Sequence, residues 1–231
     1  MAPTITARRI GLALSVLILF GTALVPLPAS AAALAAPRFV PDFRTFSASL
    51  TNGQPDVLVG AYAEDLFALP IVQQPGGQAG FVSRANDTLT NFAWPQAYGV
   101  TGLLAHNQLS GAYFFGLNPG QRIILIYGDG RTQRYIVTRL LRYQATAQLS
   151  PYSDFIDLDT QDYLSAEQLF RKVYQGEKHL TLQTCIAANG NSSWGRLFVI
   201  AVPEGPFFVR LSRIETVEVY STGQLASLPA N

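Results

Sequence analysis

Cysteine, histidine and charged residues are scarce in this sequence. A single cysteine among 231 residues means that no disulfide can form within the chain. Two histidines, with no CxxC or HExxH pattern, cannot complete a zinc site without carboxylate ligands. Only 13% of the residues are charged and the formal net charge is +1, which gives no sign of the basic stripe that nucleic-acid binding needs. The composition therefore argues against a disulfide scaffold, a zinc protein and a nucleic-acid partner.

Long hydrophobic runs are also absent, except near the N-terminus. Arg8 and Arg9 precede an apolar run over residues 10–25, and Ala29-Ser30-Ala31 fits an A-x-A cleavage site. The run of about 16 residues is shorter than the roughly 20 that a membrane-spanning helix needs. We therefore expect residues 1–31 to be a signal peptide, with an uncleaved N-terminal membrane anchor as the alternative.

Either form of this segment places the folded part of the chain outside the cytoplasm. Residues 32–42 are rich in alanine and proline and are expected to form a linker, followed by one domain over residues 43–231. We expect the protein to be secreted, or anchored to the outer face of the cytoplasmic membrane. The N-terminal segment would be its only contact with the membrane, because no second long apolar stretch follows.

Beyond the linker, apolar residues mostly recur at every second position between frequent turn signals, which predicts an all-β domain. Pro70 restricts its strand to an edge or a bulge. Residues 86–98 show no period and are expected to form a long loop. The expected strands cover residues 56–62, 66–72, 80–82, 99–104, 121–127, 133–141, 180–187, 196–202, 207–211 and 214–220.

Two local signals are sharper than the rest. Gly128-Asp129-Gly130 separates two of the expected strands and predicts a hairpin turn. Ser165, with Gln168 three residues later, forms a capping-box pattern at the start of a helix. The helix would stop near Gly176. Its apolar face consists of Leu169, Phe170, Val173 and Tyr174.

The lone cysteine of an exported protein is a candidate nucleophile, which needs a histidine and an oxyanion donor. His179 lies six residues before Cys185 on the same expected strand, roughly 20 Å away, so we expect it to be a surface or rim residue. His106 follows another strand, 79 positions before Cys185, and could pack beside it. Arg196 opens the next strand after an expected loop over residues 186–195. A hairpin there would place Arg196 beside Cys185.

These residues resemble the signature of the sortases, the bacterial cysteine transpeptidases. A histidine after a short strand stands in Leu103-Leu104-Ala105-His106-Asn107, and the family's T-L-x-T-C strand end stands in Thr181-Leu182-Gln183-Thr184-Cys185. Arg196 follows on the next strand, in Trp194-Gly195-Arg196. Between them, residues 114–120 match the pattern F-x-x-L-x-x-G. The resemblance covers roughly residues 56–203.

The resemblance implies a closed β-barrel with one or two short helices and a transpeptidase reaction. Cys185 would attack a Thr-Gly or similar bond in a sorting signal and form a thioacyl enzyme. His106 would protonate the leaving amine and deprotonate the incoming one, and Arg196 would hold the substrate and the oxyanion. Asn107 and Thr184 would support them. The implied partners are proteins with a C-terminal sorting signal and an amine acceptor on the cell wall or a pilin.

Several features depart from the family pattern. Ala105 replaces the usual glycine before the histidine, and the connection over residues 150–178 is long and contains the expected helix. No cofactor is expected. Some sortases bind Ca²⁺ near this connection, but the acidic residues here lack EF-hand spacing and favour a solvated loop. They are Asp154, Asp157, Asp159 and Asp162.

Other functions remain open besides transpeptidation. A cysteine hydrolase on the same scaffold would use water in place of the amine, and a catalytically idle module would act by interaction at the cell surface. An L,D-transpeptidase also uses cysteine and histidine on a β fold, but its cysteine stands in a S-x-G-C-x-R context. Cys185 is followed by Ile186-Ala187 and has no such context.

Overall fold

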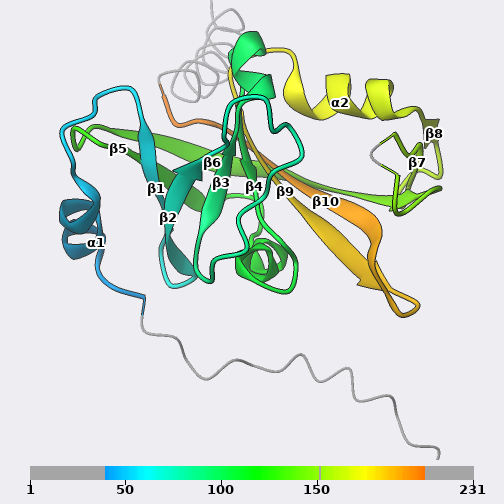
Figure 1. Cartoon of the computed structure of the whole chain (residues 1–231), viewed down its shortest axis with the longest axis horizontal. Coiled ribbons are helices and arrows are strands. Elements are labelled where there is room, and N and C mark those ends of the chain that lie inside the picture. The colour runs from blue at the N-terminus through cyan, green and yellow to red at the C-terminus, as the bar shows by residue number, and fades with distance from the viewer. Residues whose placement is uncertain (1–39, 151, 206–231) are drawn as a thin grey trace, which may run out of the picture. The chain divides into compact units, whose positions relative to one another are not determined.

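The computed structural model describes residues 40–150 and 152–205, and these residues are mainly β (Figure 1). The expected signal peptide, most of the linker and the expected strands 207–211 and 214–220 lie outside the described residues. The strands are β1 (Leu58–Ala63), β2 (Phe67–Gln73), β3 (Leu89–Phe92), β4 (Thr101–Leu104), β5 (Arg122–Tyr127), β6 (Thr132–Ala145), β7 (Phe155–Asp157), β8 (Tyr163–Leu164), β9 (Leu180–Ala188) and β10 (Asn191–Pro203). The helices are α1 (Phe43–Leu50), α2 (Ala166–Tyr174) and the 3-10 helices η1 (Trp94–Tyr98) and η2 (Ser110–Gly116).

Eight of the strands close into a barrel. They follow the order β10-β9-β4-β3-β2-β1-β5-β6, and β6 pairs with β10 to complete the circle. The two remaining strands, β7 and β8, extend the sheet from the far part of β6. The mainly β prediction and the closed barrel are confirmed. Closure leaves no free strand edge among the eight, which removes a common route to aggregation.

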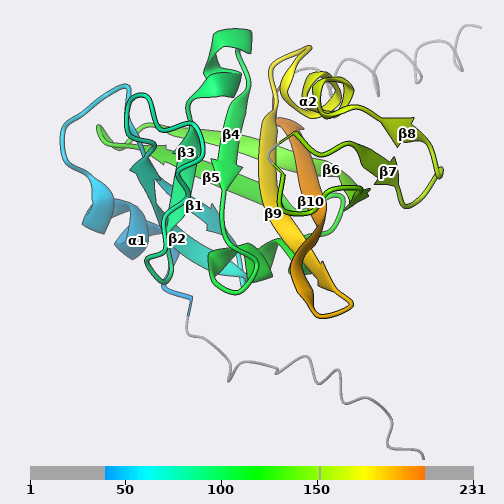
Figure 2. The ribbon, with the colours of Figure 1, turned by 45° about the vertical axis from the view of Figure 1, so that its right-hand side comes forward.

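Two of the pairings are parallel, β2 with β3 and β4 with β9. The second matters for the site, because it joins segments about 80 residues apart in the sequence. Leu104, the last residue of β4, lies level with Gln183 of β9. Figure 2 shows β4, β9 and β10 next to one another, with α2 beside β9 and β10.

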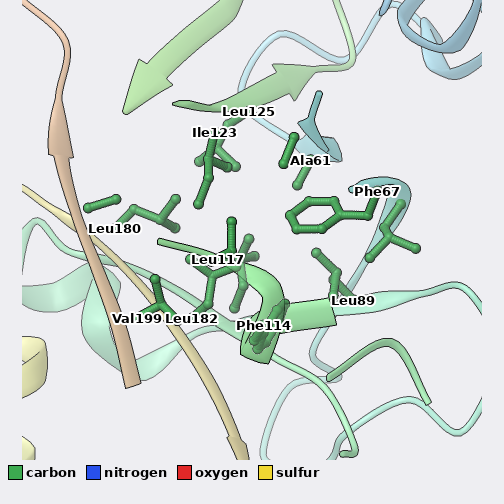
Figure 3. Packing of buried hydrophobic residues seen from close by; sticks show 14 of the residues in the cluster. Ala61, Phe67, Leu89, Phe114, Leu117, Ile123, Leu125, Leu180, Leu182 and Val199 are labelled. Carbon is green, nitrogen blue, oxygen red and sulfur yellow. The ribbon is translucent and has the colours of Figure 1, made fainter. Parts of the chain in front are cut away.

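The barrel interior is filled by aliphatic and aromatic side chains from nearly every strand. Figure 3 shows Phe67 of β2, Ile123 and Leu125 of β5, and Leu180 and Leu182 of β9 facing one core. Phe114 of η2 enters the same cluster and is fully buried. Burial of this apolar surface is the main stabilising contribution, at about 25 cal/mol per Å².

A second core lies outside the barrel wall, under α2. Along β10, Leu197 and Val199 point into the barrel, whereas Phe198 and Ile200 pack with Val173 on α2. Both faces of β10 are apolar because both are covered. The capping box at the start of α2 is confirmed: the Ser165 hydroxyl accepts from Gln168 N, and the Gln168 side chain accepts from Ser165 N.

Several local predictions were wrong. Residues 80–82 form no strand, and residues 86–98 contain β3 and η1 rather than one long loop. Pro70 lies inside β2 and not at a sheet edge: it pairs with Gly60 on one side, and the pairing with β3 begins only at Ile71. The missing proline N–H therefore faces no β3 partner.

The connection between β9 and β10 is also shorter than expected. Asn189 and Gly190, both at positive φ, make a tight turn in place of the loop over residues 186–195. Helix α1 was not predicted. Asp42 caps it by accepting from Thr45 N, and Phe46 packs in a small cluster against Tyr62 of β1.

Gly195 marks a close approach of β10 to β6 at the closure. A Cβ there would lie 2.3 Å from the Tyr143 carbonyl oxygen, which is backbone and cannot rotate away. Gly195→Ala is expected to lower the free energy of unfolding by about 1–3 kcal/mol, measured by denaturant titration. Gly76→Ala is the matched control, because a Cβ there meets no atom within 4 Å. Equal stability of the two variants would contradict the closure contact.

Candidate active site

Cys185 and Arg196 lie directly opposite each other on neighbouring antiparallel strands. The register pairs Cys185 of β9 with Arg196 of β10. On β9, Leu182 and Thr184 are buried toward the interior, so Cys185 points to the outer face, where it is half-buried. Arg196 is half-buried as well, and its neighbour Leu197 fills the core. Among the described residues, the thiol is free and has no hydrogen-bond partner.

His106 extends the same row on the other side of Cys185. The parallel pairing of β4 with β9 continues past Leu104, because Ala105 N donates to Gln183 O at 3.2 Å. One further step along both strands brings the backbone of His106 level with Cys185. Ala105 points into the barrel core, so His106 takes the outer face by alternation. Three neighbouring strands, spaced about 4.8 Å apart, thus bring His106, Cys185 and Arg196 into one row.

Backbone contacts hold the segment around His106 in place. Its carbonyl accepts from Leu109 N and from Gly111 N, each at 2.9 Å. The Thr184 hydroxyl donates to Ala105 O at 2.8 Å, which ties β9 to the residue before His106. No side chain fits at Gly111, where a Cβ would lie 2.1 Å from the Thr184 hydroxyl. Thr184 therefore supports the row from inside the barrel.

A bulge in β10 supplies two further contacts. Between Asn191 and Gly195 the register with β9 shifts, so the carbonyls of residues 192 and 193 leave the ladder. Asn107 Nδ2 donates to Ser192 O at 3.0 Å, across 85 positions of sequence. Arg196 Nη1 donates to Ser193 O at 3.0 Å and to Gly195 O at 2.9 Å. Within residues 40–150 and 152–205, a single guanidinium nitrogen takes part in hydrogen bonds, so the group keeps further N–H donors.

A pocket of about 380 Å³ opens on the outer face beside this row. Its floor contains Leu104, Gln183 and Phe198, which form the next row across β4, β9 and β10. Arg196 lines it as well. The walls are apolar and aromatic and come from α2, β7, the 79–82 segment and the residues around η1: Val82, Phe92, Trp94, Phe155, Leu169, Phe170, Val173 and Tyr174.

Aromatic rings pack against one another around the pocket, most of them edge to face. Tyr174 contacts Phe92, Phe170 and Phe198, with ring centroids 5.4, 5.3 and 6.2 Å away. Phe170 contacts Trp94, which is 64% exposed. Sequence reasoning identified Phe170 and Tyr174 only as the apolar face of a helix. Nothing in the spacing showed that this face borders a pocket next to Cys185.

His179 is buried, so its interpretation as a surface or rim residue was wrong. Only 9% of it is exposed. Its Nε2 lies 3.0 Å from the Val173 carbonyl and its Nδ1 lies 2.7 Å from the Glu177 carbonyl. The Thr181 hydroxyl donates to the same Val173 carbonyl at 2.6 Å. His179 therefore joins the end of α2 to the start of β9, away from Cys185.

The four acidic residues considered for Ca²⁺ are already used in hydrogen bonds and ion pairs. Asp157, which is buried, accepts from the backbone of Asp159 and Thr160 and pairs with Lys172 Nζ at 3.3 Å. Asp154 accepts from Tyr163 and Ala166 N, and Asp162 accepts from Thr160. Within residues 40–150 and 152–205, no group of three or more His, Cys, Asp and Glu residues is placed to hold a metal ion.

Comparisons with known proteins give structural neighbours only. No protein-family profile and no curated protein matches the chain. Sortase A from Listeria monocytogenes is 15% identical, with a TM-score of 0.40 over 65% of this chain and 89% of its own. Sortase A from Corynebacterium diphtheriae is 16% identical, with a TM-score of 0.43 over 66% of this chain and 62% of its own. Sortase C-1 from Actinomyces oris is 15% identical, with a TM-score of 0.42 over 70% of this chain and 82% of its own. In the described part, no helix is long and apolar enough to cross a membrane.

Alanine substitutions of the two histidines should differ in how much they lower the stability of the fold. His179→Ala removes a buried side chain with two hydrogen-bond partners and should lower the free energy of unfolding by about 2 kcal/mol, or several degrees in Tm. His106→Ala changes a half-buried ring with no hydrogen bond among the described residues and should stay within about 0.5 kcal/mol. Thermal melting followed by circular dichroism measures both, and the reverse order would contradict the placement of His179.

Proposed function

We propose that this protein is an exported cysteine transpeptidase of the sortase type. The observation that carries the proposal is the row across β4, β9 and β10, with Cys185 flanked by the backbone of His106 and by Arg196. A nucleophile, a proton carrier and an oxyanion donor are the three groups that acyl transfer through a thioester needs. The complete row favours an active enzyme over an idle surface module.

The first half of the reaction is acylation. The Cys185 sulfur, as thiolate, attacks the carbonyl carbon of the scissile bond and forms a C–S bond. The carbonyl oxygen becomes an oxyanion, to which Arg196 donates from its unused N–H groups. The C–N bond then breaks as His106 gives a proton to the leaving amine, and a thioester remains on Cys185.

The second half reverses these steps with a different amine. The incoming amine attacks the thioester carbonyl while His106 accepts its proton. Arg196 again donates to the oxyanion. The new C–N bond forms, the C–S bond breaks and the thiolate is restored. No redox step and no cofactor enter the balance.

The pocket supports a peptide substrate. It borders the reactive row, takes bulky apolar groups and presents few polar groups. We propose that it holds the residues before the scissile bond of a C-terminal sorting signal, and that the acceptor is an amine of the cell wall or of a pilin. The signal peptide or membrane anchor expected over residues 1–31 supports action on the outer side of the cytoplasmic membrane.

Replacing the nucleophile should abolish capture of the substrate. Peptides that carry a Thr-Gly bond within a sorting signal are mixed with the protein, and the thioacyl adduct is measured by mass spectrometry. Cys185→Ala should show no adduct and no cleavage, while its Tm stays close to that of the parent. His106→Ala and Arg196→Ala should reduce cleavage at least 100-fold. Unchanged cleavage by Cys185→Ala would falsify the assignment of the nucleophile.

Transpeptidase and hydrolase differ in what resolves the thioester. The same peptides are cleaved with and without a glycine-based amine, and the products are identified by mass. Addition of the amine should convert the hydrolysed acid into an amide product, because the amine is the better nucleophile toward a thioester. Acid as the sole product under both conditions would show a hydrolase on the same scaffold.

A further inference from the structure

The floor of the pocket contains a polar side chain that the proposed reaction does not use. Gln183 of β9 lies between Leu104 of β4 and Phe198 of β10, and both of these neighbours are apolar. It is half-buried and lines the pocket. A polar group enclosed by leucine and phenylalanine is costly unless its hydrogen bonds are made.

Tyr174 fixes the orientation of this amide. The Tyr174 hydroxyl donates to Gln183 Oε1 at 2.5 Å. The Tyr174 ring contacts the rings of Phe92, Phe170 and Phe198, and only 3% of the residue is exposed. Burial raises the pKa of the hydroxyl well above its usual value, so it keeps its proton and remains a donor. The oxygen of Gln183 is thus occupied.

The amide nitrogen keeps its two N–H donors for the pocket. Among the described residues, no acceptor is bonded to Gln183 Nε2. Gln183 and Cys185 share the outer face of β9 and are two residues apart, which corresponds to about 7 Å along the strand. An extended peptide advances about the same distance in two residues. An extended substrate that runs along β9, with its scissile carbonyl at Cys185, would therefore bring the carbonyl two residues earlier close to Gln183.

We propose that Gln183 is a substrate-binding residue that donates to a backbone carbonyl of the substrate about two residues before the scissile bond, with Tyr174 as its positioning residue. This inference rests on the proposed function of the same site. The substrate would then need a hydrogen-bond acceptor where it meets Gln183, although most of the pocket surface is apolar. A substrate without an acceptor at this point would leave the donors of Gln183 unsatisfied, which disfavours it.

The test combines variants of Gln183 with a change in the substrate. The sorting-signal peptide that gives the fastest thioacyl formation with the parent serves as probe. A second version carries a thioamide, a weaker acceptor, in place of the carbonyl two residues before the scissile bond. Gln183→Met keeps the length of the side chain and removes both donors. Gln183→Glu keeps its shape and places an acceptor there.

We expect Gln183→Met to lower kcat/KM about 3- to 10-fold, mainly through KM, because a hydrogen bond between neutral groups is lost. Gln183→Glu should lower it further. The thioamide should cost the parent a similar factor and cost Gln183→Met little, since the two changes remove one interaction. Tyr174→Phe should have a smaller effect, absent in the Gln183→Met background.

The matched control is Gln133→Met, at another Tyr–Gln pair of the described residues, where Tyr127 donates to Gln133 Oε1 at 3.4 Å on the β5–β6 hairpin. It should leave kcat/KM unchanged. Melting curves verify that every variant is folded. Parent-like kcat/KM for Gln183→Met, or losses that multiply with those of the thioamide, would overturn the role of Gln183 and leave the transpeptidase intact. Absence of any thioacyl adduct on the parent would instead remove the proposed function, and this inference with it.

Discussion

The site depends on the parallel pairing of β4 with β9. This ladder joins residues 101–104 to residues 180–183, and it sets which side chain lies beside Cys185. Parallel strands cannot be joined by a tight turn, so the pairing requires the long intervening chain, which here forms β5 to β8 and α2. The same closed barrel then holds Arg196 on the opposite side through the β9–β10 hairpin. A histidine 79 positions away in sequence becomes a neighbour of Cys185 because of one ladder.

Register is the second constraint, because side chains alternate between the two faces of a strand. A slip of one residue in β9 would turn Cys185 into the barrel and bring Thr184 to the outside. Thr184 resists this slip: its hydroxyl is bonded to the Ala105 carbonyl, and Gly111 leaves just enough room for it. The bulge before Gly195 then releases the carbonyls that hold Asn107 and Arg196. Thus the supporting contacts also fix the register.

The sequence predicts those parts of the fold whose cause is local. The capping box of α2, the β5–β6 turn and most strands follow from residue type and spacing. The errors arise where tertiary contacts decide. Residues 89–92 become a strand because β2 and β4 pair with them on either side, and Pro70 is tolerated because β3 begins to pair one residue later. His106, Cys185 and Arg196 could be named from their motif. The burial of His179 and the pocket could not, because both depend on where α2 packs.

Helix α2 joins the pocket to the strand that carries Cys185. Its apolar face covers the outer side of β10, and the same face supplies four side chains to the wall of the pocket: Leu169, Phe170, Val173 and Tyr174. His179 and Thr181 bind the Val173 carbonyl near the end of this helix, so α2 is joined directly to the strand that carries Cys185. A displacement of α2 would therefore alter both the pocket and the start of β9. Tyr174 also orients Gln183, which lies two residues before Cys185 on β9. The distance between this pocket residue and the thiol is therefore set by a single strand.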